Sequence, residues 1–114
     1  MSAAVVDVGS NTVRLLVADV SGSGLTAVRE EKAFVGLGAE ILRRGEIGAA
    51  KLEEATELAQ RYVRIARKLG ADPIEVVVTA PGRQAPNGDE LVDAIARATR
   101  VPVRLLSPDE EGVL

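Results

Sequence analysis

The sequence predicts an α/β fold in which three strands are followed by a helix, a strand, a helix and a strand, so that a mixed sheet is flanked by helices. Residues 3–32 alternate β-branched apolar runs with glycine-rich turns, which favours an antiparallel meander. Residues 49–69 repeat apolar side chains at spacings of three and four, the period of an amphipathic helix. Residues 74–79 contain three consecutive valines, which is typical of a strand covered on both faces.

The meander is expected to have strands at residues 3–8, 13–20 and 25–32. Gly9, Ser10 and Asn11 lie between the first two strands and form the first tight turn. Residues 21–24, Ser-Gly-Ser-Gly, form the second turn. Because such short turns join antiparallel neighbours, these three strands should lie side by side.

The middle of the chain changes character after the third strand. Residues 34–48 contain four glycines and an arginine pair at positions 43 and 44, which indicates a connecting segment with room for one short helical turn. A long amphipathic helix follows over residues 49–69 and ends before Gly70 and Pro73. Its expected inward side chains are Leu52, Ala55, Ala59, Tyr62, Ala66 and Leu69.

The last third of the chain alternates strand and helix. A Pro/Gly-rich loop over residues 80–86 follows the strand at 74–79, and Asn87 can cap a second helix at residues 88–100. Pro102 ends that helix before a last strand at residues 103–106. Residues 107–110, Ser-Pro-Asp-Glu, form a capping box that announces a further helix. Since so few residues follow, we expect residues 1–114 to be a single N-terminal lobe, truncated within this helix or a natural fragment.

Composition limits the possible chemistry. The 114 residues are 46% hydrophobic and 27% charged, which suffices for one domain with a core. The absence of Cys and His excludes disulfides, thiolate zinc sites and Ser-His or Cys-His nucleophiles. With Phe34 and Tyr62 as the two aromatic residues, no platform for stacking the bases of a nucleic acid polymer is expected. No leader segment or long apolar run for a membrane is found, so the protein is expected to be cytoplasmic.

The first turn carries the most informative polar chemistry. Gly9 permits positive φ and close approach of a ligand, while Ser10 and Asn11 offer side-chain donors beside backbone N–H groups. Such a turn can hold an anion, and Asp7, near the end of the first strand, can hold a hydrated Mg²⁺ ion that binds phosphate. On these residues alone, a plain hairpin in which Asp7 and Asn11 satisfy the backbone of the turn is the alternative.

A family resemblance extends this interpretation. Residues 7–12, Asp-Val-Gly-Ser-Asn-Thr, followed by residues 14–17, Arg-Leu-Leu-Val, resemble the first phosphate loop of the actin, Hsp70 and sugar-kinase superfold. Within that superfold, this motif is similar to that of the Ppx/GppA phosphatases, which are exopolyphosphatases and guanosine pentaphosphate phosphohydrolases. The resemblance covers residues 5–114 and implies a ribonuclease-H-like lobe, the first half of that family's catalytic core. The family's second, Gly-rich phosphate loop does not occur in residues 1–114.

The resemblance also implies roles for individual residues. The turn at residues 9–11 and Arg14 would bind phosphate beside a Mg²⁺ ion held by Asp7. Arg83 corresponds to a family arginine that would grip the terminal phosphate, although a solvated loop arginine is the alternative. Glu111 corresponds to the family's catalytic glutamate, a general base that orients water for in-line attack. For Glu111 the alternative is a solvated glutamate at a helix N-terminus.

The leading hypothesis is therefore one lobe of a phosphatase that uses Mg²⁺ to hydrolyse the terminal phosphate of inorganic polyphosphate or guanosine pentaphosphate. Residues 1–114 alone are expected to turn over poorly or not at all, because they form one wall of the cleft. A non-catalytic phosphate- or nucleotide-binding module of the same superfold is the alternative, and a kinase would need an adenosine pocket from a second lobe. An unfinished helix and a half-covered sheet can invite self-association, for example as a homodimer.

Overall fold

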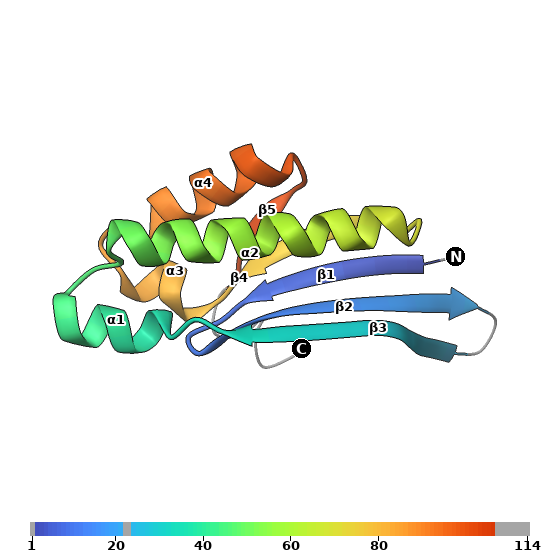
Figure 1. Ribbon diagram of the computed structural model, residues 1–114, viewed down its shortest axis with the longest axis horizontal. Coiled ribbons are helices and arrows are strands. Elements are labelled where there is room, and N and C mark those ends of the chain that lie inside the picture. The colour runs from blue at the N-terminus through green and yellow to red at the C-terminus, as the bar shows by residue number, and fades with distance from the viewer. Residues whose placement is uncertain (1, 22–23, 107–114) are drawn as a thin grey trace.

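The computed structural model describes residues 2–21 and 24–106, apart from the side chains of Ser21 and Arg83. The expected meander is formed by β1 (Ser2–Val8), β2 (Thr12–Ser21) and β3 (Gly24–Phe34). The elements that follow are α1 (Leu37–Arg44), α2 (Ala49–Lys68), β4 (Ile74–Val78), α3 (Ala80–Gln84), α4 (Gly88–Thr99) and β5 (Val103–Leu105) (Figure 1). Every predicted strand and the predicted helices at residues 49–69 and 88–100 are present, with ends within two residues of those expected. The further helix expected after residue 107 lies outside the described residues.

In the described part of the chain, five strands form one sheet in the order β3-β2-β1-β4-β5. β1 runs antiparallel to β2 and parallel to β4, and β5 runs parallel to β4. Strands that run the same way cannot be joined by a tight turn, so α2 carries the chain back before β4 and α4 does so before β5. The predicted α/β class, a mixed sheet flanked by helices, is confirmed.

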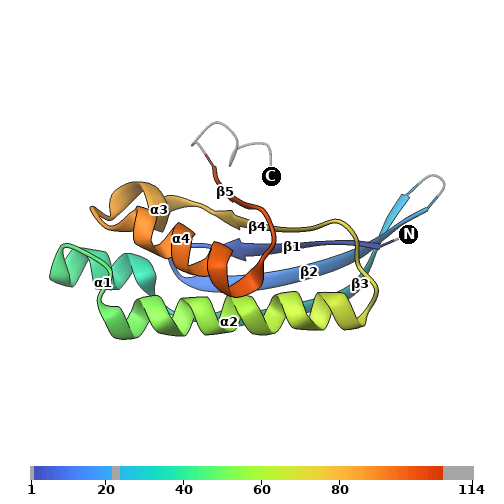
Figure 2. The ribbon, with the colours of Figure 1, turned by 90° about the horizontal axis from the view of Figure 1, so that it is seen from above.

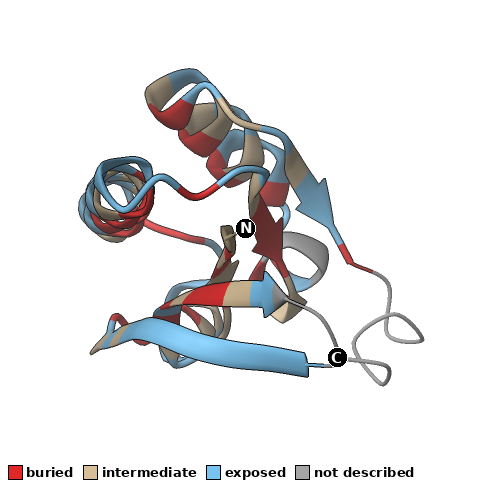
Figure 3. Ribbon diagram, turned by 90° about the vertical axis from the view of Figure 1, so that its right-hand side faces the viewer, coloured by how far each residue is buried: buried red, intermediate tan, exposed pale blue. Residues whose placement is uncertain are grey.

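The core lies between one face of the sheet and the helices that cover it. α2 packs on β1, β2 and β4, and α4 packs on α2 and β5 (Figure 2). Alternate residues of each central strand point to this face and are buried, because successive side chains of a strand point to opposite faces. β3, at the edge of the sheet, is exposed over most of its length (Figure 3). The buried core includes Val6, Val8, Val13, Leu15, Val17, Val76 and Val78 from the strands and Ala55, Ala59, Tyr62, Val63, Ala66, Leu91 and Ile95 from the helices.

α2 is the longest helix of the described residues, and polar side chains join it to α4. The Gln60 amide donates to the Ala98 carbonyl at 3.3 Å, and the Arg67 guanidinium donates to the Thr99 carbonyl at 2.8 Å. Leu69, which was expected to face inward, is 41% exposed because it lies beyond the last residue of α2. None of the helices in the described ranges is both long and apolar enough to cross a membrane.

The segment at residues 34–48 is more regular than the sequence predicted, because α1 occupies residues 37–44. Its flanking glycines begin and end the helix instead of breaking it. Gly36 and Gly45 adopt the left-handed conformation, with φ of 78° and 80°, which costs glycine little. The Gly45 N–H donates to the Ile41 carbonyl at 2.8 Å and closes the last turn.

Two expectations for the segment after β4 were wrong. Residues 80–84, expected to be a loop, form the short helix α3. Pro81 lies in its first turn, where a backbone N–H has no partner within the helix, so the lack of an N–H in proline costs no hydrogen bond. The Asn87 side chain does not cap α4. Its amide oxygen accepts from the Ile47 N–H at 3.0 Å, and its amide nitrogen donates to the Ile47 carbonyl at 2.8 Å. Asn87 therefore ties the segment before α4 to the segment before α2.

Candidate functional site

The turn between β1 and β2 lies where the carboxyl ends of the parallel strands β1 and β4 meet. The Gly9 N–H donates to the Thr12 carbonyl at 3.0 Å, and the Thr79 N–H donates to the Val8 carbonyl at 3.1 Å. Gly9 does not use the left-handed φ that the sequence suggested. Its small size is used instead, because an added Cβ would lie 3.3 Å from the Thr12 carbonyl oxygen. Ligands of open α/β sheets commonly bind at this edge.

The start of α1 holds the turn from one side. The Ser10 carbonyl accepts from the Gly38 N–H at 2.8 Å, and the Asn11 carbonyl accepts from the N–H groups of Val35 and Gly36 at 2.9 and 3.0 Å. Glycine at position 38 allows this approach, because an added Cβ would lie 3.1 Å from the Ser10 Cβ. The Ser10 C=O and the Asn11 N–H belong to the same trans peptide unit and point in opposite directions. Because the Ser10 C=O points toward Gly38 of α1, the Asn11 N–H is directed away from α1. A turn with its carbonyls held on one side presents N–H groups on the other, as anion-binding loops do.

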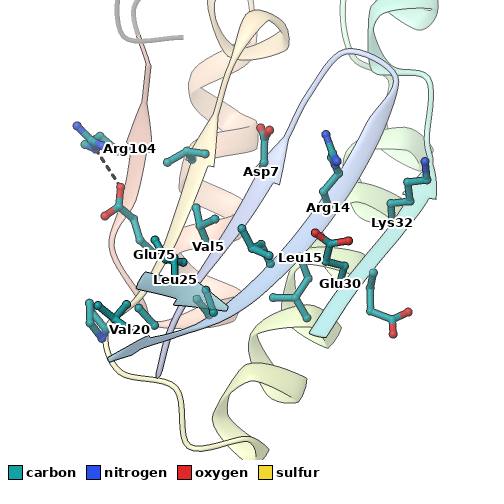
Figure 4. A pocket seen from close by; sticks show the side chains of 17 residues that line it. Val5, Asp7, Arg14, Leu15, Val20, Leu25, Glu30, Lys32, Glu75 and Arg104 are labelled. Atoms are coloured by element: carbon teal, nitrogen blue, oxygen red, sulfur yellow. Dashed lines mark hydrogen bonds and ion pairs between the residues drawn. The ribbon is translucent and has the colours of Figure 1, made fainter. Parts of the chain in front are cut away.

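One register row of the sheet brings charged side chains together beside this turn. Asp7 pairs with Arg14 across β1 and β2, and Arg14 pairs with Lys32 across β2 and β3. On its other side, Asp7 is in register with Val77, and Val77 is in register with Arg104 on β5. Residues in register share a sheet face, and these five side chains line one groove on the face opposite α2 (Figure 4).

The groove has a volume of about 760 Å³ and combines an aliphatic floor with charged side chains. Glu30 and Glu75 lie one row further from the turn, in register with Leu16 and Val5. The Oδ1 atom of Asp7 is inaccessible to solvent. The groove is lined by Ala3, Ala4, Val5, Asp7, Arg14, Leu15, Leu16, Ala18, Val20, Leu25, Glu30, Glu31, Lys32, Pro73, Glu75, Val77 and Arg104.

The cations along the row differ in their ion pairing. The Arg104 Nε donates to the Glu75 carboxylate at 3.1 Å. By contrast, Arg14 and Lys32 form no ion pair within residues 2–21 and 24–106. Two cations therefore lie side by side next to the Asp7 carboxylate. This arrangement suits an anionic ligand that is accompanied by a metal ion.

Asp7 fits a Mg²⁺ site that relies mainly on water and substrate oxygens. No group of three or more Asp, Glu, His or Cys side chains gathers in the part of the chain that the structure describes, so a closed protein cage for a cation is not formed there. In phosphate-processing sites Mg²⁺ keeps several waters and binds through one or two carboxylates plus the phosphates. The single carboxylate of Asp7, beside a turn suited to phosphate, meets that requirement.

The two predicted catalytic residues are placed only in part. Arg83 lies on α3, which follows β4 directly, so its backbone is in the segment that leaves the same edge of the sheet as the turn. The Arg83 side chain, Glu111 and the capping box at residues 107–110 lie outside what the structure describes. The predicted site residues that the structure brings together are Asp7, Arg14 and the turn at residues 9–11.

Lys32 is a groove residue that sequence reasoning missed. Counting back from the tight turn between β2 and β3 would pair Arg14 with Glu31. A β-bulge leaves Val28 without a partner in the ladder and shifts the register by one, which places Lys32 opposite Arg14. Most of β3 is exposed, so its apolar pattern carries no signal from which this shift could have been found.

Comparisons with known proteins agree with this geometry. A sequence model of the Ppx/GppA phosphatase family matches residues 15–114. Exopolyphosphatase 1 of Mycobacterium tuberculosis is 28% identical over 115 residues, which cover 100% of this chain and 33% of that protein. A guanosine-5'-triphosphate,3'-diphosphate pyrophosphatase of Aeromonas hydrophila is 29% identical over 109 residues, which cover 96% of this chain and 22% of that protein. The chain thus spans a third or less of the length of these curated relatives.

A solved structure gives the same result for the fold. The crystal structure of the Aquifex aeolicus member of the Ppx/GppA family matches with a TM-score of 0.91 at 25% identity, over 98% of this chain and 37% of that one. The predicted ribonuclease-H-like lobe of the actin superfold is thereby confirmed. Since the family model extends over most of the sequence, from β2 to the last residue, the chain belongs to the Ppx/GppA phosphatase family.

Proposed function

We propose that this chain is the phosphate-binding lobe of an enzyme that uses Mg²⁺ to hydrolyse the terminal phosphate of inorganic polyphosphate or guanosine pentaphosphate. The observation that carries the proposal is the pairing of Asp7 with Arg14 beside the turn at residues 9–11, in a chain of the Ppx/GppA family. Relatives named as an exopolyphosphatase and as a guanosine-5'-triphosphate,3'-diphosphate pyrophosphatase support the two candidate substrates.

Each site residue has its own task in this proposal. The Gly9 N–H donates within the turn to the Thr12 carbonyl, so the N–H groups of Ser10 and Asn11 bind oxygens of the terminal phosphate. Arg14 adds a cation that can donate two hydrogen bonds. Asp7 would hold Mg²⁺, which when bound neutralises charge on the phosphoryl group. Arg83 contacts the same phosphate, and Glu111 accepts a proton from the attacking water.

Hydrolysis in this scheme needs a second wall for the cleft. The groove described above lies on one face of one sheet, so a phosphate bound there stays open to bulk water on its other side. Closing an active site excludes water and strengthens each electrostatic contact inside it. We therefore expect residues 1–114 to bind phosphate with Mg²⁺ and to release orthophosphate from either substrate slowly or not at all.

Binding is tested by thermal unfolding of residues 1–114 with and without inorganic triphosphate, at several MgCl₂ concentrations. Asp7→Asn should remove the Mg²⁺-dependent part of the stabilisation by triphosphate, because a ligand raises stability only as far as it binds the folded state. Asp93→Asn is the matched control, since Asp93 is an exposed carboxylate on α4, away from the groove. Equal Mg²⁺-dependent stabilisation of the wild-type and Asp7→Asn proteins would contradict the metal assignment.

Catalysis is tested by orthophosphate release from polyphosphate and guanosine pentaphosphate in the full-length enzyme of which this chain is the proposed lobe. Glu111→Gln should abolish turnover and leave Mg²⁺-dependent binding in place. Binding without any turnover in the unmodified full-length protein would identify a non-catalytic binding module instead. Measurable release by purified residues 1–114 would show that the second wall is not needed.

A further inference from the structure

We propose that Lys32 extends the phosphate site along the register row, so that a chain of linked phosphates lies across the strands from Asp7, past Arg14, to Lys32. The inference rests on the proposed function and deepens it, because it assigns to Lys32 the contact with a second or later phosphate of the linked chain. Lys32 is directly opposite Arg14, which is directly opposite Asp7. Figure 4 shows the three side chains next to one another on the groove face.

The spacing of the row suits an extended anion. Neighbouring strands lie about 4.8 Å apart, so the backbones at Asp7 and Lys32, two strands apart, are separated by roughly 10 Å. A phosphate held by the turn and by a metal ion at Asp7 leaves Lys32 two strand positions away. Because Arg14 and Lys32 have long side chains, cations on neighbouring strands can reach different phosphates of one chain.

The charges around Lys32 also point to an anionic ligand. Like charges directly opposite each other in an antiparallel pair destabilise the sheet. Arg14 and Lys32 form such a pair, without an ion pair to a carboxylate in the described parts of the chain. Arg29, on the same strand as Lys32, is by contrast paired with Glu31 at 2.7 Å. A bound polyanion would remove the repulsion between Arg14 and Lys32.

The β-bulge in β3 is the reason that a cation occupies this position. In a regular hairpin Glu31 would lie opposite Arg14, and the two charges would neutralise each other. The extra residue, Val28, shifts the register, so Lys32 joins the row. Bulges are common beside ligand sites, where they redirect a side chain.

Glu30 allows a test of whether charge in the groove controls the affinity for a phosphate chain. It lies on the same strand as Lys32 and the same sheet face, two residues away, and it lines the same groove. Its negative charge opposes an anion bound at Lys32. Removing that charge should therefore strengthen binding of a phosphate chain, whereas removing the Lys32 charge should weaken it.

The experiment measures binding of orthophosphate, inorganic triphosphate and guanosine triphosphate to residues 1–114 by isothermal titration calorimetry in MgCl₂. Lys32→Gln should weaken binding of both triphosphates about fivefold, equivalent to about 1 kcal/mol, and leave orthophosphate binding within about twofold. Lys32→Arg should restore the affinity, and Glu30→Gln should raise it. Lys68→Gln, at the exposed end of α2, is the matched control and should change none of the three affinities.

Different failures of this experiment have different meanings. If Lys32→Gln weakened the binding of orthophosphate and of triphosphate equally, the extended site would be overturned. Lys32 would then act only by long-range electrostatic attraction on a phosphate bound near Asp7. A loss confined to guanosine triphosphate would overturn it as well, because the contact would be to the nucleoside. Triphosphate binding that Lys32→Gln leaves unchanged would overturn the inference alone. A wild-type chain that binds none of the three anions would overturn the proposed function and the inference with it.

Discussion

Glu40→Ala is predicted to destabilise the fold, because Glu40 joins α1 to the start of α2. Glu40 is 4% exposed, and its Oε2 accepts a hydrogen bond from the Gly48 N–H at 3.1 Å. Gly48 is the N-cap residue of α2 and has no side chain with which to cap the helix. The Glu40 carboxylate instead accepts from the N–H of the N-cap residue, one of the donors that have no partner within the helix, and lies at the positive end of the α2 dipole. Its Oε1 also accepts from the Arg43 guanidinium at 2.7 Å.

The expected magnitude follows from these two contacts. Removing the carboxylate leaves the buried Gly48 N–H without its acceptor, which costs about 1–3 kcal/mol. The Arg43 side chain is 72% exposed, so its ion pair contributes less than about 1 kcal/mol. The free energy of unfolding should therefore fall by about 2–3 kcal/mol, equivalent to a fall in Tm of roughly 8–12 °C for a domain of this size. Glu40→Gln keeps an oxygen acceptor for Gly48 and should lose about half as much.

Urea unfolding followed by far-UV circular dichroism measures these differences in free energy. Arg43→Ala is the matched control, because it removes the exposed partner of Glu40 and keeps the buried contact to Gly48. It should lower the free energy of unfolding by less than about 1 kcal/mol. A Glu40→Ala protein within about 0.5 kcal/mol of wild type, or an Arg43→Ala protein with the same loss as Glu40→Ala, would contradict the stabilising role of the contact to Gly48.

Asn87→Ala removes both hydrogen bonds to Ile47 and should cost about 1–3 kcal/mol in the same urea assay, whereas wild-type stability would show that this link is dispensable. Gly36→Ala places a Cβ on a residue with φ of 78°, 3.0 Å from the Phe34 ring, and should cost about 1–2 kcal/mol; an unchanged or higher urea midpoint would rule out the strain. Burial raises the pKa of Tyr62 above its ordinary value of 10.0. Above the pKa of the unfolded chain, the folded state therefore keeps a phenol proton that the unfolded chain has lost. The contribution of Tyr62 to the free energy of unfolding is complete below the unfolded pKa and is lost as pH rises through the folded pKa. Urea unfolding between about pH 9 and 11 should therefore show a steeper loss of stability for wild type than for Tyr62→Phe, and parallel curves would argue against the shift.

The strands and the two long helices could be predicted because their periodicity is strong and local. α1 and α3 could not, because short helices depend on tertiary contacts for their stability. α1 is held by the Glu40 contact to Gly48, which lies beyond the end of the helix, and by the Gly38 hydrogen bond to Ser10, which is distant in the chain. The Asn87 side chain was assigned to a helix cap for the same reason, since its partner Ile47 lies 40 residues away.

The candidate site divides in the same way. Asp7 and the turn at residues 9–11 are neighbours in the chain, so the amino acids alone could indicate an anion site there, with a plain hairpin as the alternative. The family resemblance added Arg14 to that prediction. Their alignment with Lys32 came from folding, because pairing between β2 and β3 depends on the bulge at Val28. A shift of one residue in a strand moves every side chain to the other face of the sheet. Without that shift Glu31 would lie opposite Arg14, and with it two cations lie side by side next to the Asp7 carboxylate. The proposed site for a phosphate chain depends on this tertiary feature.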